Sequence, residues 1–392
     1  MKTKIKNRQE RGITLIALVV TIVVLLILAG VSISLVLNNN GVISKSKDAR
    51  DQYAEAQTND EKQLNEVSDW IDTKVGDTTG GDSDYDPASE GVTIPDGFVY
   101  VGGTKASGLV ISDATADKEK YKGQTTVGTD LVGNQFVWIP VDDIADYKRS
   151  AYFTDVATGI IHKKSNSEKI KNNAGTDYYY ERLSTEEQLS VEANKGYYIG
   201  RYEAGDKEST GTTKATFRTS SSDTSNSVTI KADQVPYNYV TRTQAISLAE
   251  GFKTQQGYKA KTKLVSSYAW DTTIAFIEKT VNNYGSSSSQ GNYNDKSVTY
   301  KDITDESKPE KTKAENSSLL VATGQTTPVC NIYDMGGNVY EWTTESSSFP
   351  NNPYGRRGGR YSKNFATSPA CYRYFGSDDA SDGIGFRLTL FM

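Results

Sequence analysis

A long uncharged run near the N-terminus constrains this chain more than any other feature. Ile13–Leu37 contains no charged side chain, and its 25 residues are enough to cross a bilayer as a single helix. Residues 1–11 are polar and basic, which favours the cytoplasmic side for this end. No small-residue cleavage site follows the run, so an ordinary secretory signal fits poorly. The sequence therefore predicts an N-terminal membrane anchor.

The junction before this run, R-G-I-T-L-I from Arg11, resembles the processing site of type IV prepilins. The resemblance implies a leader at 1–12 that is cut after Gly12, leaving Ile13 as the new N-terminus. It also implies that the helix anchors the subunit and later packs in a filament. Members usually carry Glu at the fifth mature position, where this chain has Ala17. A minor pilin, a pseudopilin, a membrane-held display protein and a plain anchor helix remain alternatives.

The residues after the apolar run predict a helical stalk followed by a flexible linker. Apolar side chains from Ala49 to Ile71 recur at mostly helical spacings, so we expect a transmembrane and stalk helix over 13–74. Residues 75–91 are rich in Gly, Asp and Ser, which is typical of a flexible linker. A separate domain, the head, is expected over 92–392.

Composition narrows the function of the 392-residue chain. Its 44 basic and 49 acidic residues are mixed along the sequence without a basic stripe, so nucleic acid is a poor candidate partner. The 25 tyrosines suit either a recognition surface or half-buried filling of a polar extracellular domain, and composition alone favours filling. One histidine, His162, excludes a His-rich metal centre and lies in a polar stretch.

The head has short β-type runs and two helical segments, which predicts an α+β fold with a modest, irregular sheet. FVYVGG, QFVWIPV and GYYIGRYEAG are the β-type runs, bounded by Gly and Pro. One helix would place Ala245, Leu248, Ala249 and Phe252 on one face, with Thr241 or Thr243 as its N-cap. The other would bury Trp270, Ile274 and Ile277 after a cap at Ser266 or Ser267.

Several motifs follow one another along the head. F-V-W-I-P precedes Y-x-I-G-R-Y-E and P-x-x-x-V-T-x-x-x-A, and then come a Trp-bearing helix, IYDMGGNVYEW, R-G-G at Arg357 and G-F-R at Gly385. This order resembles the formylglycine-generating-enzyme family, also called the sulfatase-modifying-factor domain, over about 92–392. The resemblance implies a loop-rich variant of the C-type-lectin-like fold whose C-terminal segment forms a ligand surface.

In that family the segment matching IYDMGGNVYEW wraps a calcium ion. The resemblance implies four ligands: the side chains of Asp334 and Glu341 and the carbonyls of Gly337 and Val339. Calcium accepts about six to eight oxygens, mixing carboxylates with backbone carbonyls, and glycines let carbonyls converge. We expect a structural ion, with Trp342 anchoring the loop in the core. The alternative is a turn with two solvated carboxylates and no ion.

The oxidase members bind copper(I) through two cysteines, and this chain has half of that site. Cys371 matches the second cysteine with its C-Y-R-Y context, but Ala366 stands five residues earlier. No other cysteine follows Gly359. We therefore expect no enzyme, and the single histidine cannot supply the ligands that iron-dependent relatives need. We expect Cys330 to form a disulfide with Cys371 in an oxidising exterior.

Residues 360–384, between the R-G-G and G-F-R motifs, are rich in Tyr, Asn, Ser, Asp and Arg. This segment resembles the variable region of proteins that retroelements diversify, which use the same lectin-like fold. Aromatic groups flanked by small polar ones suit an adaptable binding surface. The expected contact residues are Arg360, Tyr361, Lys363, Asn364, Phe365, Tyr372, Tyr374, Phe375, Ser377, Asp378 and Asp379. An ordinary polar loop of fixed specificity is the alternative.

Together these features predict a binding protein at the cell surface. A prepilin-like anchor would carry a calcium-stabilised, lectin-like head that binds a protein or glycan without catalysis. The rival hypotheses are a membrane-tethered oxidase of the formylglycine-generating type and a structural minor pilin that contacts other pilus subunits.

Overall fold

The computed structural model describes residue 20, residues 22–26, and most of the chain from 84 to 392. The gaps in the second part are 150–153, 156–159, 162–168, 172–176, 180–182, 207–215, 221–226, 288–289, 306 and 347–350. The chain divides into two compact units, Met1–Thr78 and Thr79–Met392.

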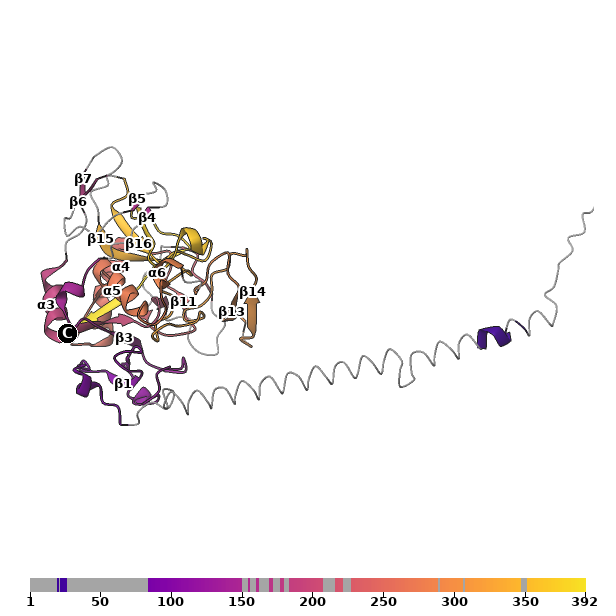
Figure 1. The fold of residues 1–392 in the computed structure, drawn as a ribbon, viewed down its shortest axis with the longest axis horizontal. Helices are drawn as coiled ribbons and strands as arrows, with labels where there is room; N and C mark the ends of the chain where they lie inside the picture. The colour runs from indigo at the N-terminus through magenta and orange to yellow at the C-terminus, as the bar shows by residue number, and fades with distance from the viewer. Residues whose placement is uncertain are drawn as a thin grey trace, which may run out of the picture. The chain divides into compact units, whose positions relative to one another are not determined.

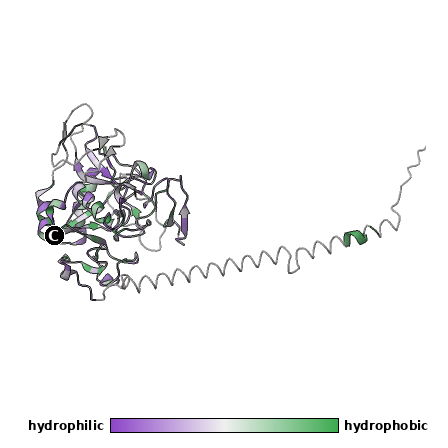
Figure 2. Ribbon diagram, in the orientation of Figure 1, coloured by the Kyte–Doolittle hydropathy of each residue, from purple (hydrophilic) through white to green (hydrophobic). Residues whose placement is uncertain are grey.

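The N-terminal unit is described at only six residues. Val20 and Ile22–Leu26 are helical and hydrophobic (Figure 2), whereas the predicted leader and most of the anchor and stalk lie outside the described residues. Within the described part of the chain, no helix is both long and apolar enough to cross a membrane. His162 also lies outside the described residues.

The end of the predicted linker belongs to the folded head. Asp86 caps a short 3-10 helix, η1 (Pro87–Glu90), by accepting a hydrogen bond from the N–H of Ala88. Tyr85 packs against the hydrophobic core, and its hydroxyl accepts a hydrogen bond from the N–H of Lys105 at 3.0 Å. The prediction of a flexible linker up to residue 91 is therefore wrong for 84–91, because these residues have long-range partners that composition does not reveal.

The largest sheet among the described residues, here called the central sheet, has six antiparallel strands, of which Figure 1 labels β1 and β3. Its order is β1 (Val99–Gly102), β2 (Val110–Ser112), β3 (Gln135–Pro140), β8 (Gly196–Gly200), β19 (Leu388–Phe391) and β12 (Lys261–Leu264). The three β-type runs of the sequence become β1, β3 and β8, as predicted. The last strand of the chain lies between β8 and β12, so the C-terminal residues complete the sheet.

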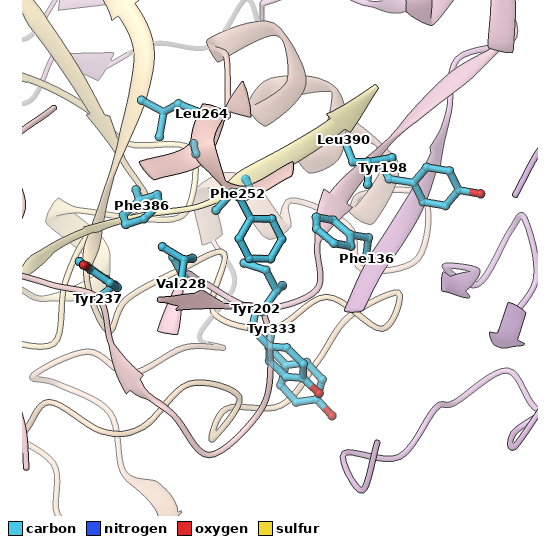
Figure 3. Close-up of a cluster of buried hydrophobic side chains, with 14 of the residues drawn as sticks. Phe136, Tyr198, Tyr202, Val228, Tyr237, Phe252, Leu264, Tyr333, Phe386 and Leu390 are labelled. Carbon is cyan, nitrogen blue, oxygen red and sulfur yellow. The ribbon is translucent and has the colours of Figure 1, made fainter. Parts of the chain in front are cut away.

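Both faces of this sheet are covered. On β3, Phe136 and Trp138 belong to one hydrophobic cluster, whereas Val137 and Ile139 belong to another. Alternate residues of a strand point to opposite faces, so the strand is buried on both sides. Figure 3 shows part of the first cluster, in which the rings of Tyr202 and Tyr333 stack with centroids 4.9 Å apart.

The two predicted helices are present with their buried faces. In α4 (Arg242–Gln256), Thr241 is the N-cap and forms a capping box with Gln244. In α5 (Ser267–Ile277), Ser266 caps the helix by accepting a hydrogen bond from the N–H of Ala269. A further helix, α3 (Thr185–Asn194), lies beside the C-terminus, where the hydroxyl of Ser190 donates to the carbonyl of Met392.

A second sheet of four strands carries the C-terminal motifs. Its order is β17 (Arg373–Gly376), β16 (Tyr354–Arg357), β15 (Tyr340–Ser346) and β18 (Ile384–Phe386), with β15 and β18 parallel. A hairpin of β13 (Val298–Lys301) and β14 (Glu310–Lys313) is strongly hydrophilic (Figure 2).

The remaining described elements are short. They are β9 (Gly205–Asp206), β10 (Val228–Thr229), β11 (Val235–Pro236), the pairs β4 (Thr154–Asp155) with β5 (Ile160–Ile161) and β6 (Lys169–Lys171) with β7 (Asp177–Tyr179), helix α6 (Tyr284–Ser287), and the 3-10 turns η2 (Thr115–Asp117), η3 (Ile144–Asp146) and η5 (Phe365–Thr367). The α+β prediction for the head is thus confirmed.

Candidate functional site

The eleven predicted contact residues lie between β16 and β18, and none of them is buried. Lys363, Asn364, Tyr374, Ser377 and Asp379 are exposed, and the others are half-buried. Strand β17 carries Tyr374 and Phe375, and the rest lie in the loops before and after it. The structure thus presents the whole predicted set at the surface of the head.

Three tyrosines form a contiguous aromatic group at this surface, here called the tyrosine cluster: Tyr340, Tyr372 and Tyr374. The ring of Tyr340 lies 6.0 Å from that of Tyr374 at an interplanar angle of 23°. The ring of Tyr372 lies 6.3 Å from Tyr340 and 6.4 Å from Tyr374. Tyr340 is buried, whereas Tyr374 is 44% exposed, so the cluster presents one ring outward from a buried base.

Arg356 extends this group into a row across three strands. It pairs with Trp342 of β15 on one side and with Tyr374 of β17 on the other. Its guanidinium carbon lies 4.7 Å from the Trp342 ring centroid and 4.9 Å from that of Tyr374, within the range of cation–π attraction. Asp379 fixes the same guanidinium through an ion pair of 3.2 Å. The row Trp342–Arg356–Tyr374 is therefore held in one arrangement.

Acidic side chains tie the surrounding loops to the scaffold. Asp378 accepts a hydrogen bond of 2.5 Å from the hydroxyl of Thr243, in the first turn of α4. Asp382 accepts one from the hydroxyl of Tyr361 and forms an ion pair of 3.9 Å with Arg360. These contacts hold the segment that carries the predicted contact residues.

The opposite face of the same strands is a buried charge network. Arg357 and Arg373 both bind the carboxylate of Asp271 on α5, the latter at 2.9 Å. Arg373 also binds Glu345 at 2.6 Å. Alternation along β16 therefore sends Arg356 toward the tyrosine cluster and Arg357 into the interior.

One of the predicted calcium ligands, Glu341, is part of a buried ion pair. Glu341 binds Arg387 with two short contacts, 2.7 Å from Nη2 to Oε1 and 2.9 Å from Nε to Oε2. Asp334 accepts hydrogen bonds from the N–H of Gly324 at 2.6 Å and the hydroxyl of Thr326 at 2.7 Å. Both carboxylates are buried, so they are not solvated as the alternative required, whereas the calcium ion stays a prediction.

The backbone between these carboxylates turns tightly, as expected. Gly337 has a φ of +78°, and a Cβ there would lie 2.5 Å from the carbonyl oxygen of Asn292. Val339 is buried beside the start of β15. The role of the two carbonyls as calcium ligands stays a prediction.

A third buried carboxyl group, that of Glu203, adjoins this loop. Its Oε1 accepts a hydrogen bond from the side-chain amide of Asn338, whereas its Oε2 has no hydrogen-bond partner among the described residues. Burial and the nearby charges of Asp334 and Glu341 raise the pKa of Glu203 well above its ordinary value. Among the described residues, Glu341 is the one of these three carboxyl groups that pairs with the Arg387 guanidinium. Across the described ranges, no group of three or more His, Cys, Asp or Glu side chains is arranged to hold a metal ion.

The two cysteines are free thiols, so the predicted disulfide is absent from the structure. The sulfur of Cys330 lies 3.3 Å from the hydroxyl oxygen of Thr280. Cys371 packs against Gly285: a Cβ added at Gly285 would lie 3.2 Å from the Cβ of Cys371. Burial raises the pKa of both thiols. Sequence spacing could not fix this geometry, because pairing requires a short distance between the two Cα atoms.

Sequence reasoning missed Tyr340, Arg356 and Asp382, which support the predicted contact residues. Period-two alternation in YEWTTES could have placed Tyr340 and Trp342 on one face. No local signal indicates that Arg356 faces Trp342 rather than the interior, because that depends on strand register.

Comparison with known proteins supports part of the family resemblance. Residues 253–390 match the family described as Sulfatase-modifying factor enzyme 1-like domain. This match includes residues 332–342, here called the calcium-like loop, and the segment of the predicted contact residues. No curated protein matches the sequence.

Three solved structures resemble the chain at low identity. Treponema denticola variable protein 1 has 12% identity and a TM-score of 0.36, with 67% of this chain and 97% of that one covered. CarF has 12% identity and a TM-score of 0.32, covering 50% and 87%. PvdO from Pseudomonas aeruginosa has 17% identity and a TM-score of 0.28, covering 58% and 100%. At these TM-scores the likenesses do not assign a function to this chain.

Proposed function

We propose that the head binds a protein or glycan ligand through the exposed part of the tyrosine cluster and the segment of about 360–384, supported by the buried Arg356, without catalysing a reaction. The observation that carries this proposal is the row Trp342–Arg356–Tyr374, which ends in an exposed ring on a buried base. Tyr, Trp and Arg dominate the binding energy of protein interfaces. Fixing their rotamers before binding lowers the entropic cost of association.

The test is binding of the full-length protein to arrays of glycans, proteins and cell surfaces, followed by titration of any ligand found. Tyr374→Ala should weaken binding by about 30-fold, the effect of losing a hot-spot side chain worth about 2 kcal/mol. The control is Leu189→Ala on α3, another exposed large apolar residue outside the proposed surface. Equal affinity of Tyr374→Ala and wild type would remove the tyrosine cluster from the proposal.

Retroelement diversification of this segment is part of the proposal. Its support is that all eleven predicted contact residues lie at the surface while the flanking strands are buried. A near-copy of the codons for about 356–387, differing at adenines and lying next to a reverse-transcriptase gene, would establish diversification. Without such a copy, the surface has fixed specificity.

Display at the cell surface on a prepilin-type anchor is also proposed, on the strength of Gly12, Ile13 and the apolar run after them. Mass spectrometry of the mature N-terminus is the test, with cleavage after Gly12 expected. Protein recovered from the medium without residues 13–37 would contradict the anchor. Association with other pilus subunits would favour the structural minor pilin.

The rival oxidase hypothesis makes a different prediction. A copper-dependent enzyme would bind copper(I) through Cys371 and consume oxygen in the presence of thiols. Two soft thiolate ligands suit copper(I), but the position five residues before Cys371 is Ala366, which is exposed on η5. Copper binding that disappears in Cys371→Ser, together with oxygen consumption, would overturn the non-catalytic proposal.

A calcium ion at the loop of Asp334 and Glu341 completes the proposal. Its support is the surplus of buried carboxyl groups over guanidinium groups and the unpartnered Oε2 of Glu203. When bound, calcium would supply positive charge and crosslink the loop. Thermal unfolding in millimolar calcium against excess chelator tests this, and we expect a higher midpoint with calcium. Identical midpoints would leave Arg387 as the compensating charge of this loop.

A further inference from the structure

Lys313, at the end of β14, is a buried cation without an ion pair. Lys313 is only 3% exposed, and its ammonium group donates three hydrogen bonds to backbone carbonyls. These are the carbonyls of Tyr293 at 2.8 Å, Lys296 at 2.5 Å and Ser317 at 3.0 Å. An ammonium group has three hydrogens, so its donor capacity is fully used. Among the described residues it forms no ion pair. Burial lowers the pKa of its ammonium group, and the nearby charges of Asp295 and Glu315 oppose that effect.

Burying a charge in this way costs free energy that an apolar side chain would avoid. The gain is geometric, because one ammonium group draws together carbonyls from two segments of the chain. Tyr293 and Lys296 belong to a turn closed by the N–H of Lys296, which donates to the carbonyl of Tyr293 at 3.2 Å. Ser317 follows the hairpin and donates its own N–H to the carbonyl of Asn294 at 3.2 Å.

The turn held by Lys313 contacts the proposed binding surface directly. The N–H of Asn294 donates to the carbonyl of Lys363 at 2.9 Å. The carboxylate of Asp295 accepts from the N–H of Phe365 at 3.0 Å. The Phe365 ring packs edge-on against Tyr293, with centroids 5.9 Å apart, and the Lys296 ammonium lies 5.3 Å from it. All four residues from 293 to 296 thus contact 363–365, two of them through hydrogen bonds and two at the Phe365 ring.

We infer that Lys313 is a positioning residue: its ammonium group sets the conformation of residues 293–296 and, through them, that of Lys363–Phe365 in the binding surface. That Lys313 affects ligand binding rests on the proposed function, whereas its effect on the conformation of these residues does not. Lys313 touches no predicted contact residue, so its effect on the surface passes through the turn.

Hydrogen exchange of the full-length protein tests this inference. Lys313→Met keeps an unbranched apolar side chain, one heavy atom shorter than that of lysine, but removes all three donors. The matched control is Lys311→Met on the same strand, which removes an exposed ammonium paired with Asp302. We expect the amides of Asn294 and Phe365 to exchange about tenfold faster or more in Lys313→Met, as local opening becomes easier. Strand β17 should exchange as in wild type, and Lys311→Met should not change either region.

Unchanged exchange at Asn294 and Phe365 in a folded Lys313→Met protein would overturn the inference. If that variant does not fold, Lys313→Arg replaces it, because a planar guanidinium keeps the charge but cannot place three donors on the same carbonyls. Faster exchange confined to 293–296 and 363–367 is then expected, and wild-type exchange there would overturn the inference. Faster exchange in a protein that binds no ligand would leave the positioning role intact and remove only the proposed function.

Discussion

At the scale of single residues, the head depends on buried charges whose partners are distant in sequence. Glu341 and Arg387 are 46 positions apart and both fully buried, and Arg387 also donates to the carbonyls of Gly200 and Tyr333. This guanidinium therefore joins β15, β8 and the calcium-like loop. Such pairs are costly to break because the remaining charge stays buried.

We expect Glu341→Gln to lower the free energy of unfolding by about 3–5 kcal/mol, because it leaves Arg387 buried without its counter-charge. Urea unfolding measures this change. The control is Glu186→Gln, which removes a half-exposed carboxylate that bridges Lys261 and Lys263. Its cost should stay below about 1 kcal/mol, as for other surface ion pairs. Similar losses in both variants would contradict the structural role of the buried pair.

The raised pKa of Glu203 predicts that the stability of the fold depends on pH. Its pKa is raised in the folded protein, first by burial and then by Asp334 and Glu341. The folded state therefore holds this proton more tightly than the unfolded state does. The contribution of Glu203 to stability is present below the unfolded pKa of about 4.5 and is lost as pH rises through the folded pKa.

The variant Glu203→Gln cannot titrate, and its amide oxygen can still accept from Asn338. Its free energy of unfolding should fall less than that of wild type as pH rises above about 4.5. Urea unfolding of both proteins over a pH series gives the difference. Parallel curves for the two proteins would mean that Glu203 does not titrate differently in the folded and unfolded states.

At the scale of elements, helix α4 links a local cap to the binding surface. The capping box of Thr241 and Gln244 starts the helix, and Thr243 in its first turn holds Asp378. Sequence reasoning left Thr241 and Thr243 open as the N-cap, and the structure selects Thr241. The other threonine therefore has a different task, which is to tie the segment after β17 to the scaffold.

Thr241→Ala should lower the free energy of unfolding by about 1 kcal/mol, the usual cost of losing an N-cap side chain. Thr243→Ala should change it by less than about 0.5 kcal/mol, because Thr243 is exposed. The second variant should instead speed hydrogen exchange around Asp378. A larger loss of stability in Thr243→Ala than in Thr241→Ala would reverse the assignment of the cap.

At the scale of the whole molecule, the end of the chain completes the central sheet. Strand β19 pairs with β8 on one side and β12 on the other, and it contributes Leu388 and Leu390 to the core. The predicted contact residues, from Arg360 to Asp379, therefore lie in sequence between β16 and the two buried strands β18 and β19. Substitutions in a surface loop bounded in this way can alter its side chains without altering the strands on either side of it.

Deletion of 388–392 should abolish cooperative unfolding, because it leaves β8 and β12 without their shared neighbour and removes three core side chains, Leu388, Leu390 and Phe391. Deletion of Met392 alone should keep a cooperative transition, since it leaves the whole strand in place. Thermal unfolding followed by circular dichroism distinguishes the two. A cooperative transition in the longer deletion would show that β19 is dispensable for the fold.

Local sequence patterns were enough to predict several elements of the head. The caps and buried faces of α4 and α5 and the strands β1, β3 and β8 follow from patterns a few residues long, and such patterns act locally. The polar and aromatic composition of 360–384 predicted an exposed contact set, and in the structure five of its eleven residues are exposed and six are half-buried.

Contacts between groups far apart in the sequence could not be predicted from such patterns. The partner of Glu341, the row through Arg356, the central place of β19, the carbonyls around Lys313 and the separate environments of the two cysteines depend on the path of the chain between them. The wrong predictions, a linker up to 91 and a disulfide, both concern contacts between distant segments. Spacing and composition constrain a residue's near neighbours, whereas these contacts are fixed by strand register and by the packing of segments far apart in the sequence.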